Sequence, residues 1–259
     1  MLKDSRYGVW CLLLGIAACL FSCRPSVEET CLMSYNIRNG RGLDDSISYT
    51  RIAEVIRRVN PDLVALQELD SMTQRSGQTY VLGELARLTG MYDVYAPAID
   101  YDGGKYGIGM LAKEKPLHVY SRALPGREEA RRLLMLEYPD YVYACVHLSL
   151  TEEDRMASLP VILEEFGRFR KPVFIAGDWN ATSESLFIQE VLKHFVLLTA
   201  ADEYTFPADT PNCTLDYIAV SKLVPVTFRK REAEVVDAPV ESDHRPVVVR
   251  TQWQYERKK

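Results

Sequence analysis

Residues 173–180 read VFIAGDWN, and this stretch gives the clearest indication of how the chain folds. Its first half, from Val173 to Ala176, is a continuous apolar run, which is typical of a strand buried on both faces. The run ends in Gly177-Asp178, and Asn180 follows two residues later. Buried polar groups cost free energy unless they are hydrogen-bonded or bind something. The stretch therefore predicts a sheet whose strand ends carry a functional site.

Other strand-like segments end in polar residues in the same way. These residues are Asn36, Glu68, His147, Asp216, Asp243 and His244. Taken singly, a carboxylate at a strand end is more often a cap or a salt-bridge partner than a ligand. Because strand ends of one sheet meet at one edge, the whole set predicts a shared mouth.

The remaining pattern predicts a mixed-sheet α/β protein of one domain. Apolar residues at helical spacing favour helices in residues 48–60, 80–90, 152–169 (interrupted at Pro160) and 183–195. Residues 131–138 and 141–149 are typical of a β-hairpin with a Pro139-Asp140 turn. Residues 95–113, rich in Tyr, Gly and Asp, indicate a mobile loop that becomes strand-like only at its far end.

The N-terminal residues are typical of an export signal rather than of the fold. Lys3 and Arg6 precede an apolar run that is too short to span a membrane comfortably. LFSC at 20–23 resembles a lipobox, so we expect a lipoprotein signal in residues 1–22, an acylated Cys23 and a linker in 23–29. IAAC at 16–19 is a second candidate, and a soluble secreted protein or a short uncleaved anchor are alternatives. The expected location is extracytoplasmic, with the protein lipid-anchored to a bacterial membrane.

The bulk composition sets loose limits on the partners of the 30–259 domain. The 259 residues carry a net charge of -5, and cleavage before Cys23 removes Lys3, Arg6 and Asp4 and leaves -6. An acidic balance argues against a protein that coats nucleic acid through a broad basic face. We expect a monomer.

The polar strand ends lie in segments that resemble the endonuclease/exonuclease/phosphatase family of metal-dependent hydrolases. The matching segments occur in family order: MSYNIRNG (33–40), LVALQELD (63–70), YGIGMLAK (106–113), VHLS (146–149), IAGDWNA (175–181), LDYIAVS (215–221) and SDHRPV (242–247). The resemblance implies a four-layer sandwich, two mixed β-sheets packed face to face with helices on both outer faces.

The resemblance also implies the metal ligands. Glu68 matches the family's principal ligand for Mg²⁺ or Mn²⁺, Asn36 matches its partner amide, and Asp243 is the expected additional ligand. Arg38 stands where the abasic endonucleases have an acidic residue, which puts a second fully occupied metal site in doubt.

For the catalytic residues, the resemblance assigns Asp178 to orienting the attacking water and Asn180 to a phosphate oxygen. Asp216 would hold His244, which acts as a base or binds the phosphate, and His147 would protonate the leaving oxygen. A structural histidine is the alternative for His147.

Two residues are candidates for substrate binding. Arg131 matches an arginine of many family members, with a surface salt bridge to nearby glutamates as the alternative; Tyr106 is a weaker candidate. His118 and His194 match no motif of the family, so we expect both to be surface or core histidines.

These roles imply a metal-dependent phosphoesterase in which water attacks phosphorus in line. A short linker would hold the site near a lipid surface, which favours a phospholipid or inositol-phosphate-type head group, or a diffusing phosphate ester. The alternatives are a secreted nuclease that cleaves DNA or RNA and, least favoured, a binding module without activity.

Overall fold

The computed structural model describes residues 28–200 and 202–256, which form two six-stranded sheets and four α-helices. In spatial order, the first sheet contains β11 (Val226–Val235), β12 (Val247–Tyr255), β1 (Glu28–Asn36), β2 (Leu63–Ser71), β4 (Gly104–Ala112) and β3 (Tyr92–Tyr101). The second contains β5 (His118–Leu124), β6 (Arg131–Glu137), β7 (Val142–His147), β8 (Val173–Asp178), β10 (Asp216–Ser221) and β9 (Phe195–Leu197). The predicted signal, Cys23 and most of the predicted linker lie outside the described residues; β1 begins at Glu28, two residues before the predicted domain start.

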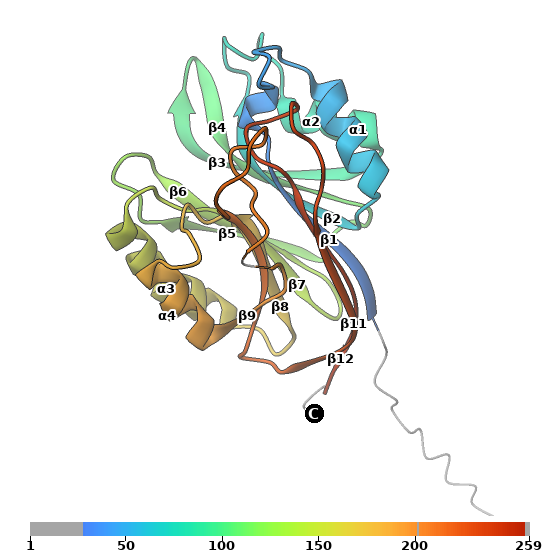
Figure 1. Cartoon of the computed structure of the whole chain (residues 1–259), viewed down its shortest axis with the longest axis vertical. Coiled ribbons are helices and arrows are strands. Elements are labelled where there is room, and N and C mark those ends of the chain that lie inside the picture. The colour runs from blue at the N-terminus through green and yellow to red at the C-terminus, as the bar shows by residue number, and fades with distance from the viewer. Residues whose placement is uncertain (1–27, 201, 257–259) are drawn as a thin grey trace, which may run out of the picture.

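The layers confirm the predicted four-layer sandwich. Helices α1 (Tyr49–Val59) and α2 (Val81–Thr89) cover the outer face of the first sheet, and α3 (Glu152–Phe166) and α4 (Leu186–His194) cover that of the second (Figure 1). The sheets face each other through fully buried side chains such as Phe174, Tyr143 and Trp253. Burial of one such ring stabilises the fold by about 2–3 kcal/mol. Within the described ranges, no helix is long and apolar enough to cross a membrane.

Helix α1 illustrates why the predicted helices form. Ile52, Val55 and Ile56 are buried on one face, and Ser48 accepts a hydrogen bond from the backbone N–H of Arg51 as the N-cap. Asn60 ends the helix in the left-handed conformation.

Two expectations about local structure were wrong. Residues 95–113 are not a mobile loop: β3 and β4 form a hairpin across residues 102 and 103, both at positive φ. Asp-Gly is a strong signal for such a tight turn, but the exposed edge strand β3 hides the alternation that would have revealed it. Helix α3 also continues through Pro160, which costs one intrahelical hydrogen bond, the one to the carbonyl of the exposed residue Met156.

Strand pairing brings the predicted residues to one edge. In the second sheet, Asp178 at the end of β8 pairs with His147 at the end of parallel β7 and with Asp216 at the start of antiparallel β10. In the first sheet, Asn36 ends β1 beside Gln67 of parallel β2. The two sheets therefore place these ends at one mouth of the sandwich.

Gly177 is required where β8 enters this mouth. Its φ is +155°, and a Cβ at this position would lie 1.9 Å from the backbone oxygen of Val146 in β7. Replacing Gly177 with alanine is expected to lower the free energy of unfolding by about 3 kcal/mol, because β7 and β8 would have to separate. Chemical denaturation measures the effect, with Gly167→Ala as control because its Cβ would lie 3.4 Å from the nearest atoms. Equal losses in both variants would contradict this account.

Candidate active site

Asp178 lies at the centre of the site and is almost fully buried. Its Oδ2 accepts a hydrogen bond of 3.0 Å from Asn36 Nδ2, and lies 3.5 Å from His147 Nε2 and 3.7 Å from His244 Nε2. Its Oδ1 accepts a hydrogen bond from the backbone N–H of Asn180. One carboxylate thus contacts residues that come from both sheets.

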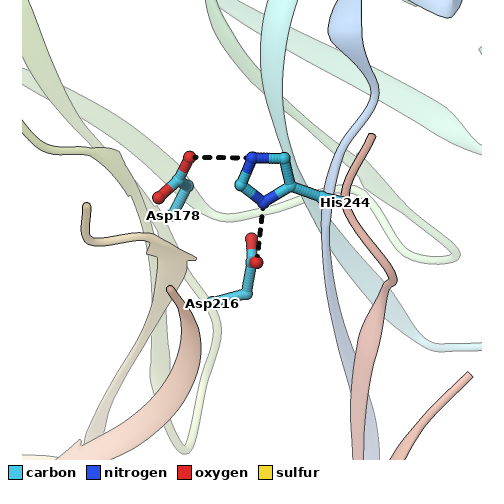
Figure 2. A group of neighbouring side chains, drawn as sticks. All are labelled: Asp178, Asp216 and His244. Atoms are coloured by element: carbon cyan, nitrogen blue, oxygen red, sulfur yellow. Dashed lines mark hydrogen bonds and ion pairs between the residues drawn. The ribbon is translucent and has the colours of Figure 1, made fainter. Parts of the chain in front are cut away.

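His244 bridges two carboxylates, as Figure 2 shows. Its Nδ1 lies 2.8 Å from Asp216 Oδ2, while Nε2 faces Asp178. Burial alone would lower the pKa of His244, but the charges of Asp216 and Asp178 overcome this effect and raise the pKa to about 10. An imidazolium held in this way can donate to an anionic oxygen at neutral pH, which favours phosphate binding over a role as base.

His147 differs from His244 because, among the described residues, a single carboxylate, that of Asp178, contacts it. Burial lowers the pKa of His147 to about 3, opposed by Asp178 and assisted by the positive charge of Arg131. The imidazole is therefore neutral at neutral pH in this arrangement. Its expected role as a proton donor stays a prediction, because an approaching anionic substrate would first have to raise this pKa.

Glu68 reaches the mouth through a β-bulge in β2. The pairing of β2 with β4 shifts between Leu66 and Leu69, and Glu68 adopts a positive φ of 60°. Its Oε1 accepts a 3.0 Å hydrogen bond from Asn36 Nδ2. Burial raises the pKa of Glu68, and the charges of Asp243 and Asp178 raise it further.

Asn36 donates to the site instead of accepting. Its Nδ2 serves both Glu68 and Asp178, and its Oδ1 accepts a hydrogen bond from the backbone N–H of Arg38. Because carboxylates accept and an N–H donates, all three contacts fix the same amide orientation. Asn36 therefore positions the two carboxylates here, and its predicted role as a metal ligand would need a rotated amide.

The donor set fits a divalent cation. The carboxylates at the mouth are Glu68, Asp178, Asp216 and Asp243. The cationic groups in contact with them are His244 and Arg38, whose Nε lies 3.5 Å from Asp243 Oδ2. Asp216 Oδ1 is buried without a hydrogen-bond partner among the described residues. Excess negative charge on hard oxygen atoms suits Mg²⁺ or Mn²⁺.

Two sets of residues in the mouth could hold this cation. Asp178, Asp216 and His244 each offer an atom within 4.8 Å of the others. In that group His244 already pairs with both carboxylates, whereas Glu68 accepts a hydrogen bond from Asn36, and Asp243 pairs with Arg38 and accepts a hydrogen bond from Ser242 Oγ. Glu68 and Asp243 stay the ligands that the family resemblance predicts, and Asp178, Asp216 and His244 form the alternative set.

Asn180 has one N–H left for a substrate. It adopts a positive φ of 49°, and its Nδ2 donates to the backbone oxygen of Leu148. An amide nitrogen carries two N–H bonds, so the hydrogen bond to a phosphate oxygen that the family resemblance implies stays a prediction for the second one.

Arg131 and Tyr106 lie beside His147, and all three line one small cavity. Arg131 forms ion pairs with Glu128 and Glu129, so the alternative that the sequence left open is present, but the arginine is buried instead of lying at the surface. Burial raises the pKa of Tyr106 well above its usual range, and the charge of Glu68 contributes. His118 lies away from the mouth on β5, and His194 ends α4.

Sequence reasoning missed residues that hold the site together. Ser242 Oγ donates to the backbone oxygen of Asn36 and so ties the loop before β12 to the end of β1. Thr205 Oγ1 accepts from the backbone N–H of Leu215, and the ring of Phe206 lies 4.8 Å from that of His244. Ser242 stands inside the SDHRPV motif and could have been noticed; the segment containing Thr205 and Phe206 carries no such signal.

The two imidazoles should titrate far apart. In metal-free protein we expect His244 to stay protonated at pH 8 and His147 to stay neutral at pH 5, as measured by NMR of the ring nitrogens. Since the pKa of His147 lies below its unfolded value of about 6.5, acidification from there towards pH 3 should destabilise the fold. The stabilisation from His244 is complete below about 6.5 and is lost towards pH 10. Two imidazoles that titrate together near pH 6.5 would contradict this electrostatic picture.

The sandwich and its mouth of carboxylates, amides and imidazoles define an α/β protein with a hydrolytic type of site at its strand ends. The model of the endonuclease/exonuclease/phosphatase family matches residues 33–244, which include every described site residue named above. The chain therefore belongs to this family, whose members hydrolyse phosphate esters. A comparison of the sequence with curated proteins finds no significant match.

Solved structures with the same fold come from bacteria and from man. A family member from Bacteroides vulgatus is 19% identical, with a TM-score of 0.69, and the match covers 88% of this chain and 100% of the other. A mannosyl-6-phosphatase from Bacteroides thetaiotaomicron is 16% identical (TM-score 0.64; 86% and 99% covered). The human Nocturnin catalytic domain with bound sulfate is 20% identical (TM-score 0.64; 91% and 100% covered). At such identities the likeness shows the fold alone.

Proposed function

We propose that this protein is a divalent-metal-dependent phosphoesterase outside the cytoplasmic membrane that hydrolyses a diffusible phosphate ester. The observation that carries the proposal is the contact set of Asp178, which joins Asn36, His147 and His244 from both sheets around one carboxylate. Lipid anchoring through Cys23 is part of the proposal and rests on the sequence.

The residues of the mouth divide the chemistry between them. Asp178 can accept a hydrogen bond from water and align it for in-line attack on phosphorus. A carboxylate repels an anionic phosphate, so other groups must supply donors: the imidazolium of His244 and the second Nδ2–H of Asn180. Asp216 keeps His244 protonated and fixes its ring. A divalent cation held by Glu68 and Asp243 would add Lewis-acid stabilisation of the developing charge.

The direction of β1 favours a diffusible substrate over a head group of the anchoring membrane. The strand begins at Glu28, on the side of the predicted anchor, and ends at Asn36 in the mouth. Nine residues of strand span about 30 Å. Figure 1 shows the start of β1 and the loop before β12 at opposite ends of the first sheet. The mouth would thus lie about 30 Å from the start of β1, the end of the strand that follows the predicted anchor.

A matched substrate panel tests this proposal. Protein from Ser26 onward would be given Mg²⁺ or Mn²⁺, or chelator, with a hexose 6-phosphate, a phosphodiester reporter, sphingomyelin vesicles, phosphoinositide vesicles or plasmid DNA. Metal-dependent cleavage of a soluble ester is expected. Cleavage of lipids alone would contradict the diffusible substrate, and nicked plasmid with inert esters would make the protein a nuclease.

A further inference from the structure

A small cavity beside the catalytic residues contains a carboxylate that the proposed mechanism does not use. Its lining includes Tyr106, Arg131 and His147, and also Glu129 from the loop before β6. A glutamate is an unexpected neighbour for an arginine that faces an anionic substrate. The contacts of Arg131 show how this arginine is held.

Arg131 is an almost completely buried cation with unused donors. It is 5% exposed; its Nη2 lies 3.4 Å from Glu128 Oε1, and its Nη1 lies 3.2 Å from Glu129 Oε1. Within the described residues, Nε and Nη1 have no hydrogen-bond partner of good geometry. A buried guanidinium with free N–H groups has capacity for a further anionic oxygen.

The two glutamates that flank Arg131 are held very differently. Glu128 accepts hydrogen bonds from Ser149 Oγ and from the backbone N–H of Leu150, both at 2.7 Å, so it is a fixed part of the wall. For Glu129 we find no side-chain hydrogen bond in the described parts of the chain, and its side chain is 25% exposed. Its contact with Arg131 is therefore a single ion pair that a stronger anion can replace.

A second arginine, Arg75, adds positive charge near Glu129. Arg75 donates two hydrogen bonds to the buried Asp70, and its guanidinium lies 4.4 Å from the ring centroid of Tyr101 and 5.5 Å from that of Tyr106. Its charge acts on Glu129 together with that of Arg131. Burial and the charge of Glu128 nevertheless raise the pKa of Glu129 above its usual value, so the two arginines hold this carboxylate only weakly.

We propose that Glu129 determines specificity by holding the place on Arg131 that an anionic oxygen of the substrate takes over. This inference rests on the proposed phosphoesterase function. A phosphomonoester, with close to two negative charges at neutral pH, displaces a carboxylate more readily than a phosphodiester with one. The inference therefore narrows the substrate class to phosphomonoesters, because Glu129 disfavours the binding of singly charged esters to Arg131.

Sulfate binding to the metal-free protein directly tests whether Glu129 competes with an anion for Arg131. Sulfate has the shape of phosphate and a constant double charge, and its dissociation constant can be measured by calorimetry. Glu129→Gln should bind sulfate about tenfold more tightly than the wild type, because a competing charge is removed. Glu234→Gln, which breaks an exposed ion pair with Arg250, is the matched control and should leave binding unchanged. In an Arg131→Gln background the gain should disappear.

Unchanged or weaker sulfate binding in Glu129→Gln would overturn the inference, because it would make Glu129 a simple structural counterion. Glu129→Asp is a second variant, in which a shorter side chain retracts from Arg131 and a smaller gain is expected. The measurement needs neither metal nor turnover, so its outcome is separate from that of the substrate panel. On turnover, Glu129→Gln should lower KM more for the phosphodiester reporter than for a monoester, with kcat within about twofold.

Discussion

Replacing Glu68 with glutamine is expected to reduce metal-dependent turnover by about a thousandfold or more. Glu68 is pushed into the mouth by the bulge in β2, and Asn36 donates to its Oε1. Glutamine can still accept this hydrogen bond, so the fold should survive while the charge that would hold the cation is lost. The rate of phosphate release and the affinity for Mg²⁺ by calorimetry measure the two effects together.

Glu234→Gln serves as control, since Glu234 is exposed on the edge strand β11 and forms its ion pair with Arg250 instead of with a residue of the mouth. Its turnover should match that of the wild type. A Glu68→Gln protein that keeps most of its activity and its Mg²⁺ affinity would show that the cation is held elsewhere. The group of Asp178, Asp216 and His244 would then be the site to test.

The second large effect is expected for His244→Gln, which should lower kcat by about a thousandfold. The substitution removes the imidazole that bridges Asp216 and Asp178, and with it the cation that the proposed mechanism uses to bind the phosphate. Asp216→Asn should cause a smaller loss, because the imidazole stays but one of the charges that raise its pKa disappears. Comparing kcat and KM separates loss of transition-state stabilisation from loss of substrate binding.

His118→Gln is the matched histidine control for this experiment. His118 begins the edge strand β5 and is exposed, so its replacement should leave kcat unchanged. Equal losses in His244→Gln and His118→Gln would mean that the mouth is not the catalytic site.

The sequence predicted the helices, most strands and the polar strand ends, because buried apolar runs and helical spacing are local signals. The layout of two sheets is not local, and it entered only through the family resemblance. Asn36 and Asp178 are 142 residues apart, and only the packing of one sheet on the other brings them into hydrogen-bonding contact. The register that sets His147 beside Asp178 likewise depends on parallel pairing across a helix.

The charged state of the site was also beyond the sequence. The sequence shows His147 and His244 as the same residue type. In the structure, burial lowers the pKa of His147, whereas the charges of Asp216 and Asp178 raise the pKa of His244. Glu129 was passed over because a glutamate in the run EEARR is typical of a solvated surface. Only the buried position of Arg131 gives that glutamate a possible role.

The most direct test of the central claim is the rate of phosphate release from a soluble ester as Mg²⁺ or Mn²⁺ is added to chelator-treated protein from Ser26 onward. The account predicts no release without the cation, saturable release with it, and almost none from Glu68→Gln at the same concentrations. Release that is indifferent to the cation, or equal in the wild type and Glu68→Gln, would contradict a metal-dependent phosphoesterase site at this mouth.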